Sequence, residues 1–254
     1  MAAAPVLPPT SPAPESAPLS EAARIIDTFI APSKTFTDLR RSAAWWGPFL
    51  VLIAVGILFT YGVGQKVGFD RATENILQSK PKQWDRIQSM PPEERDKVML
   101  GAAKRTMIVS YIFPLINLIL LLIVAGVLLA TFKFAANANV SYKIALAIVV
   151  YASLPGALKY LLATGTLFAG ISPDAFNLQN PIATNLGFLF SATDNPVLYA
   201  IASMVDIFVI WTLALTAIGF TCVSKVKRGT ALAIVFGWYI FFMIVIAGLT
   251  SLGS

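Results

Sequence analysis

Long apolar segments recur along the chain, separated by shorter polar stretches. Each has about 20 residues with few charges, the length that an α-helix needs to cross the hydrocarbon core of a bilayer. Trp45 and Trp46 open the first segment, where aromatic rings favour the membrane interface. The pattern predicts an all-α fold, a polytopic membrane bundle of five transmembrane helices, with spans near 45–65, 107–132, 144–168, 197–223 and 231–251.

The residues before the first span divide into two parts. Residues 1–18 are rich in Ala and Pro and contain no aromatic residue, which predicts a disordered tail. They lack the pattern of a cleaved secretory signal, so we expect the N-terminus to be retained. Residues 19–44 are expected to form cytosolic interfacial helices, and residues 45–254 the membrane domain.

Two short helices are predicted within 19–44. Ser20 is the expected N-cap of the first, Pro32 ends it, and Ser33 is the expected N-cap of the second. Apolar residues recur at helical spacing in the first helix, and the second can direct basic side chains to lipid phosphates. Both helices can equally pack on the cytosolic face of the protein. The apolar residues are Ile25, Ile26, Phe29, Ile30, Phe36 and Leu39, and the basic ones are Lys34, Arg40 and Arg41.

Two longer loops carry helix signals. In the helical loop 66–106, Phe69, Ile76 and Leu77 indicate an amphipathic helix, and the run 91–94, Pro-Pro-Glu-Glu, marks the start of another. We expect a small helical cap lying on the membrane. Loop 169–196 contains Ser172-Pro173, Asn180-Pro181 and Asn195-Pro196, which predict one or two short helices.

The basic residues of the short loops predict the orientation. Residues 133–143 and 224–230 contain Lys133, Lys143, Lys225, Lys227 and Arg228, whereas 169–196 and the C-terminus contain no Lys or Arg. The positive-inside rule therefore places the N-terminus in the cytoplasm and the C-terminus outside. Loop 66–106 opposes this assignment with nine basic residues, although six acidic residues are interleaved with them.

Composition excludes most soluble functions. The chain of 254 residues is 57% hydrophobic and 13% charged, against about 25% charged in soluble domains. It has no His, which excludes His-based catalysis and metal sites, and Cys222 as its one cysteine cannot form an internal disulfide. The net charge of +6 is explained by loops that flank membrane spans, so we expect no nucleic-acid partner.

Four motifs resemble the YIP family of integral membrane proteins, named for interaction with Ypt/Rab GTPases. They are FIAPSKTFTDL (29–39), WWGPF (45–49), YASLP (151–155) and DIFVIWTLALTAIGF (206–220), within a resemblance that covers residues 24–250. The motif positions are Pro32, Phe36, Trp46, Gly47, Pro48, Tyr151, Pro155, Asp206, Trp211 and Gly219. The resemblance implies a five-helix bundle, a cytosolic N-terminus, no enzyme activity and no cofactor.

The resemblance also bears on partners and location. Eukaryotic members have Asp-Leu-Tyr-Gly-Pro before the first span, whereas Ala44, Trp45 and Trp46 precede Gly47 and Pro48 here. This difference argues against a small GTPase as partner and favours a bacterial-type member in the inner (cytoplasmic) membrane. We expect contact with the lipid bilayer and with a membrane-protein partner or a second copy of the chain.

Ionisable residues at membrane depth are costly and worth locating. With the predicted spans, Lys159 and Asp206 both lie about 14 Å below the outer boundary, and Asn117 lies within about 2 Å of that depth. We predict one intramembrane polar layer made of these three residues. It can be an ion pair that fixes helix register, a functional pocket or ion path, or two side chains that snorkel apart. A Ser-Lys dyad is disfavoured, because six residues place Ser153 and Lys159 on different helix faces. Ser203 on the next span could meet Lys159 only through an interhelical contact, and a lysine paired with Asp206 would stay protonated and could not act as the base.

The sequence favours a non-enzymatic, membrane-organising or partner-binding protein. A carrier or channel that uses the polar layer is one alternative, with kinks at Pro114 and Pro155 framing a cavity. An accessory subunit of a larger membrane complex is another. No metal-ligand cluster, phosphate loop or carboxylate pair is recognisable in the sequence.

Overall fold

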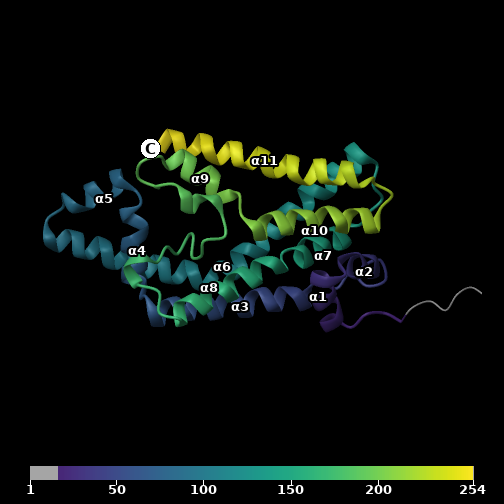
Figure 1. The fold of residues 1–254 in the computed structure, drawn as a ribbon, viewed down its shortest axis with the longest axis horizontal. Helices are drawn as coiled ribbons and strands as arrows, with labels where there is room; N and C mark the ends of the chain where they lie inside the picture. Colours follow the sequence, from purple (N-terminus) through teal and green to yellow (C-terminus); the bar gives the residue numbers. More distant parts are fainter. Residues whose placement is uncertain (1–16, 254) are drawn as a thin grey trace, which may run out of the picture.

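The computed structural model describes residues 17–253, and the chain within this range folds as an all-α bundle (Figure 1). The predicted disordered tail lies outside the described residues except for Ala17 and Pro18. The helices are α1 (Glu21–Ile30), α2 (Pro32–Asp38), α3 (Trp46–Lys66), α4 (Phe69–Gln78), α5 (Pro81–Gln88), α6 (Pro92–Ala136), α7 (Tyr142–Ala152), α8 (Leu154–Phe168), α9 (Pro196–Met204), α10 (Ile207–Val223) and α11 (Arg228–Gly253), with 3-10 turns η1 (Pro173–Ala175) and η2 (Leu186–Leu189).

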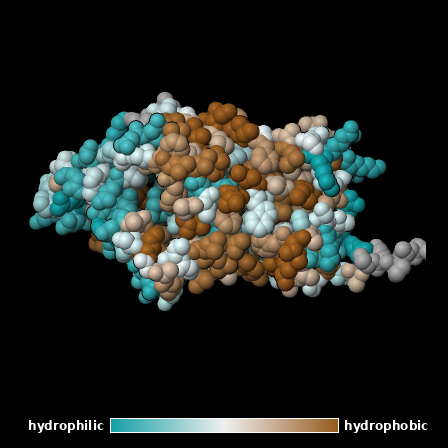
Figure 2. All heavy atoms as spheres, viewed as in Figure 1, coloured by the Kyte–Doolittle hydropathy of each residue, from teal (hydrophilic) through white to brown (hydrophobic). Residues whose placement is uncertain are grey.

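The predicted fold class is confirmed. Within the described chain, four segments are long and apolar enough to cross a membrane: α3, α6, the α7–α8 pair and α11. Figure 1 shows them running side by side between two ends, with α1 and α2 at one end and α4 and α5 at the other, where the C-terminus also lies. Figure 2 shows a hydrophobic belt between two hydrophilic ends, as expected of a protein surrounded by lipid.

The fourth predicted span, 197–223, is not one helix. It is divided into α9 and α10, and the backbone between them is extended at Asp206, with φ −116° and ψ 136°. The Asp206 carboxylate accepts hydrogen bonds at Oδ1 from the N–H groups of Phe208, at 2.8 Å, and Val209, at 3.3 Å. Asp206 is therefore the N-cap of α10, and this cap explains why a new helix begins at membrane depth.

The expected helical cap of loop 66–106 is partly wrong. α4 is the predicted amphipathic helix, and a helix does begin at Pro92 with Glu93 and Glu94 in its first turn. That helix, however, does not end before the membrane, because no helix-breaking residue separates it from the second span. It continues through Pro114 to Ala136 as α6, whose 45 residues extend about 68 Å, more than twice the thickness of the hydrocarbon core.

Helix ends follow several of the sequence signals. The Ser20 hydroxyl accepts a hydrogen bond from the N–H of Ala23 and caps α1 as predicted. The prediction of Ser33 as the second N-cap is wrong, because α2 begins at Pro32, a residue that favours the first helical position, and its N-cap is Ala31, two residues earlier than predicted. η1 and α9 begin at Pro173 and Pro196, while Asn180-Pro181 starts no helix.

The bundle core is densest near the α1–α2 end. α7 is buried over most of its length, and its last turn gives way to α8 at Ser153, two residues before Pro155. Phe132 of α6 and Phe220 of α10 stack in parallel with ring centroids 4.0 Å apart, and both are fully buried. α10 also contacts α2, so the first short helices are attached to the core of the bundle.

Candidate functional site

α1 directs its polar side toward the protein. Arg24, Asp27 and Thr28 are buried, Arg24 to 2% exposure, whereas Ile26 and Ile30 are 58% and 75% exposed. For Ile26 and Ile30 this is the reverse of the arrangement in a surface helix of a soluble protein, where the apolar face turns inward, whereas Ile25 and Phe29 of the same helix are partly buried against the bundle core. An exposed apolar face is instead suited to contact with lipid.

A buried charge network fixes this orientation. The Arg24 guanidinium pairs with Asp38 Oδ2 through two nitrogens: Nε donates a hydrogen bond of 2.8 Å, and Nη2 lies 2.7 Å from the same oxygen. Its third nitrogen, Nη1, lies 3.0 Å from Glu21 Oε1. Burial opposes the charge of Arg24, but the hydrogen bond and charge of Asp38 outweigh it and raise the pKa of Arg24 above its usual value. The second oxygen of Glu21 accepts a hydrogen bond of 2.8 Å from the Tyr151 hydroxyl of α7. Three helices are thus joined through one arginine.

Motif residues from distant parts of the sequence complete this cluster. A Cβ atom at Gly47 would lie 2.6 Å from Glu21 Oε2, so a larger residue at position 47 would displace the Glu21 carboxylate from its present place. Gly219 of α10 is similarly packed, since a Cβ there would overlap the Ile148 side chain and lie 3.2 Å from Phe36. We call Glu21, Arg24, Asp38, Gly47 and Tyr151 the Arg24 cluster.

The remaining motif positions surround the cluster or lie apart from it. Pro32 opens α2, and Phe36 and Pro48 are buried. Trp211 contacts Phe29 of α1 edge-on, with ring centroids 5.7 Å apart. Trp46 is 56% exposed, whereas Pro155 is the buried second residue of α8 and Asp206 lies deeper in the bundle.

The predicted interfacial basic residues lie at the α1–α2 end. Lys34 is exposed and forms an ion pair of 2.8 Å with Asp27 of α1. Arg40 and Arg41 follow α2, and Lys225, Lys227 and Arg228 lie at the turn between α10 and α11, all exposed. Basic side chains thus lie at the same end of the molecule as the exposed isoleucines of α1, which gives this end the composition of an interfacial site.

Two residues of the predicted polar layer meet. Lys159 Nζ lies 2.8 Å from Asp206 Oδ2, which also accepts a 2.6 Å hydrogen bond from the Thr184 hydroxyl. Oδ1 caps α10, so both carboxylate oxygens of Asp206 have partners within the protein. Asn117 does not join them. It lines a cavity bounded by α3, α6 and α8, and no hydrogen bond joins it to either residue of the pair in the described chain.

Sequence reasoning missed the Arg24 cluster. It placed Arg24 and Asp27 away from the apolar side of the first helix and assigned them no partner. The available signal was charge complementarity, because the charges alternate in sign along 21–38, in the order Glu21, Arg24, Asp27, Lys34 and Asp38. Among the described residues, no group of three or more His, Cys, Asp or Glu side chains is arranged to hold a metal ion.

Comparison with known proteins gives one match. A family model described as the Yip1 domain matches residues 26–249, which includes α2 to α10 completely, the second half of α1 and most of α11. No curated protein and no solved structure matched the chain.

Proposed function

Because the chain belongs to the Yip1 domain family, we propose that it is a non-enzymatic membrane protein that organises the bilayer through its α1–α2 end. The observation that carries this proposal is the exposed apolar edge of α1 formed by Ile26 and Ile30. Ile26 and Ile30 are exposed to the surroundings while the Arg24 cluster holds the polar side of the helix on the bundle. A helix fixed in this way inserts its apolar face between lipids each time the protein is in a membrane.

The energetics support insertion. Complete burial of an isoleucine side chain is worth about 1.5–3 kcal/mol, and the two isoleucines of α1 are more than half exposed in the protein alone. Basic side chains near an anionic leaflet add about 1 kcal/mol each. The two isoleucines and the basic residues at this end of the molecule therefore favour the same position, at the headgroup level of an anionic leaflet.

The charge distribution supports a cytoplasmic N-terminus. In the described chain, the α1–α2 end carries nine basic and three acidic side chains, whereas the α4–α5 end carries nine basic and eight acidic ones. The first end is therefore the positive one, which the positive-inside rule assigns to the cytoplasm. This placement, with the C-terminus outside and the bacterial-type Trp45-Trp46-Gly47-Pro48 sequence, favours the bacterial inner membrane.

The alternatives have less support. A carrier would need a free ligand group in the polar layer, but the carboxylate oxygens of Asp206 are already engaged by Lys159, Thr184 and the start of α10. If the protein were an accessory subunit, the exposed apolar side of α11 could contact the larger complex. Lipid alone can also cover that side, so it does not favour this hypothesis. A small GTPase is not supported, and a membrane-protein partner or a second copy remains part of the proposal.

Depth measurements test the insertion of α1. Ile26→Cys or Ile30→Cys in a Cys222→Ser chain, labelled with an environment-sensitive fluorophore and reconstituted in vesicles, should be quenched by lipids brominated on their acyl chains. The matched control is Arg40→Cys, an exposed position beyond α2 that should be quenched much less. Equal quenching at positions 26, 30 and 40 would show that α1 does not insert.

A second measurement tests the effect on the bilayer. The full chain reconstituted at increasing density should deform vesicles, as seen by electron microscopy, and the double variant Ile26→Ser/Ile30→Ser should do so less. The control is Leu189→Ser, which removes an equally exposed leucine (74%) from η2, outside α1. If the double variant and wild type deform vesicles equally, α1 is not the organising element.

A further inference from the structure

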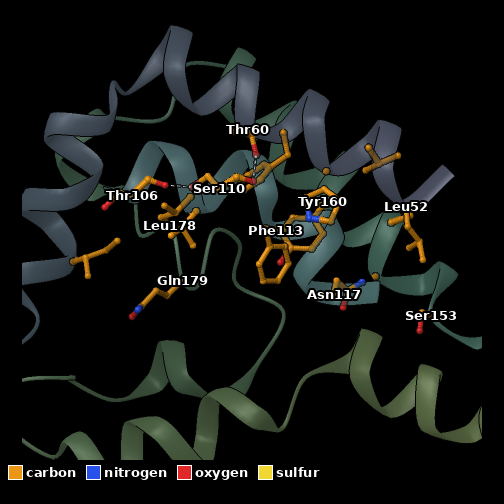
Figure 3. A pocket seen from close by; sticks show the side chains of 18 of the residues that line it. Leu52, Thr60, Thr106, Ser110, Phe113, Asn117, Ser153, Tyr160, Leu178 and Gln179 are labelled. Carbon is orange, nitrogen blue, oxygen red and sulfur yellow. Dashed lines mark hydrogen bonds between the residues drawn. The ribbon is translucent and has the colours of Figure 1, made fainter. Parts of the chain in front are cut away.

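A large cavity lies inside the bundle, away from the Arg24 cluster. Its volume is about 800 Å³, within the range of about 300–1,000 Å³ typical of ligand pockets. α3, α6 and α8 form its long walls, Thr212 of α10 contributes to it, and α4 and loop residues Leu178 and Gln179 line its α4–α5 end (Figure 3).

The lining is apolar along most of its length. α3 contributes residues from Phe49 to Thr60, and α6 contributes one continuous face from Ala102 to Asn117. Several hydroxyl groups of the wall are hydrogen-bonded within the protein: Thr60 to the Ser110 carbonyl, Thr73 to Thr106, and Ser110 to the Thr106 carbonyl. These groups are satisfied already, so the cavity presents mainly hydrocarbon to an occupant. Such a space favours an apolar ligand over water.

One charged side chain lies at the mouth of this space. Arg105 lines the cavity, is exposed, and forms no ion pair among the described residues. It lies two residues before Met107, where the apolar part of α6 begins, and so at the level of lipid headgroups. Asn117 lies twelve residues farther along α6, about 18 Å deeper. Figure 3 shows Thr106, Ser110, Phe113 and Asn117 in succession along this wall.

These dimensions match one lipid chain. The hydrocarbon core is about 30 Å thick, so the chains of one leaflet occupy about half of that depth. The apolar wall from Arg105 to Asn117 therefore extends from the interface to about the middle of the bilayer. A guanidinium at the interface binds phosphate or carboxylate oxygens through charge-assisted hydrogen bonds.

We propose that this cavity is a binding site for one anionic membrane lipid, whose headgroup pairs with Arg105 and whose acyl chain fills the space between α3, α6 and α8. The ligand comes from the leaflet at the α4–α5 end, opposite to the one that α1 contacts. This site is independent of the membrane-organising function, because its residues are not part of the Arg24 cluster.

Gly156 offers a direct test of occupancy. It lines the cavity, and a Cβ atom there would meet no atom within 4 Å, so Gly156→Phe or the smaller Gly156→Leu fills the space without displacing the wall. Gly165→Phe is the matched control, since Gly165 lies on the same helix, is equally free of neighbours, and does not line the cavity. Circular dichroism and size-exclusion chromatography confirm that each variant folds.

The measurement is native mass spectrometry of the full chain, purified in mild detergent and titrated with phosphatidylglycerol or phosphatidylcholine. We expect one phosphatidylglycerol to bind each wild-type and Gly165→Phe chain saturably, with about tenfold weaker binding to Gly156→Phe. Arg105→Gln should lower the preference for phosphatidylglycerol over phosphatidylcholine about three- to tenfold, because the headgroup contact is partly solvated.

Two results would overturn the proposal. Unchanged phosphatidylglycerol binding by both folded Gly156 variants would show that the lipid does not occupy the cavity. Equal binding of the two lipids by the wild-type chain would show that Arg105 does not select an anionic headgroup. Neither result depends on vesicle deformation, so failure of this proposal is distinguishable from failure of the proposed function.

Discussion

Replacement of Arg24 by methionine should release α1 and α2 from the bundle. The substitution keeps the length of the side chain but removes the cation that faces Asp38 and Glu21. Removing one partner of a buried ion pair typically costs about 3–5 kcal/mol, because the remaining charge stays buried. Glu21 is 27% exposed at its side chain and can regain water, so we expect the lower end of that range.

Hydrogen–deuterium exchange of the segment 21–38 measures this release directly. Amides of docked helices exchange through local opening, and a loss of about 3 kcal/mol raises the open population roughly 100-fold. Peptides from α11 in the same digest serve as the internal reference, since the helices that α11 mainly contacts are α6, α9 and α10. We expect faster exchange in α1 and α2 and unchanged exchange in α11.

Lys34→Met is the matched control for charge removal in the same two helices. Lys34 pairs with Asp27, but its side chain is 59% exposed, and such pairs contribute about 0–1 kcal/mol. Exchange should therefore rise at most about fivefold. If Arg24→Met increased exchange no more than Lys34→Met, the Arg24 cluster would not be what holds α1 in its orientation.

The other predictions concern packing and the intramembrane pair. Gly219→Ala should destabilise the bundle by about 1–3 kcal/mol in reversible SDS unfolding, because the added Cβ would overlap Ile148. The control Gly237→Ala should be neutral or stabilising, because a Cβ there meets nothing within 4 Å. Equal effects of the two substitutions would refute the packing argument. Asp206→Ala should destabilise more than Lys159→Met, by about 1 kcal/mol for the lost helix cap alone. Adding Lys159→Met to Asp206→Ala should restore part of the loss in the same assay, and a strictly additive double variant would mean that the pair is not coupled.

The positions of most membrane spans along the chain could be predicted, because the bilayer permits few backbone conformations. An apolar segment of about 20 residues must become a helix, since backbone polar groups find no water in the bilayer. Counting residues from the loop ends predicts that Lys159 and Asp206 lie at one depth, and the two side chains are 2.8 Å apart in the structure. Asn117 was placed at the same depth but faces the cavity, because depth alone does not determine the side of the helix on which a residue lies.

The interruption at Asp206 could not be predicted from hydropathy. Residues 197–223 are apolar enough to read as one span, and a single carboxylate within them indicates a partner but not a break. The break depends on residues from another part of the chain: Thr184 donates to the same carboxylate, and its carbonyl accepts from the N–H of Ile207. Irregular backbone is tolerated at this depth only because the loop after α8 supplies these partners.

The orientation of α1 shows where a rule from soluble proteins gives the wrong answer in a membrane. In water, the apolar face of an amphipathic helix turns inward because burial there is the only way to remove it from solvent. At a bilayer surface the lipid offers a second apolar environment, so Ile26 and Ile30 lose nothing by facing outward. The polar face then gains more by turning inward, where Arg24 can meet Glu21 and Asp38 in a site of low dielectric constant. Ile25 and Phe29 still pack on the core, so the solvent and the acidic partners of Arg24 together decide which part of the apolar surface of α1 is left outside.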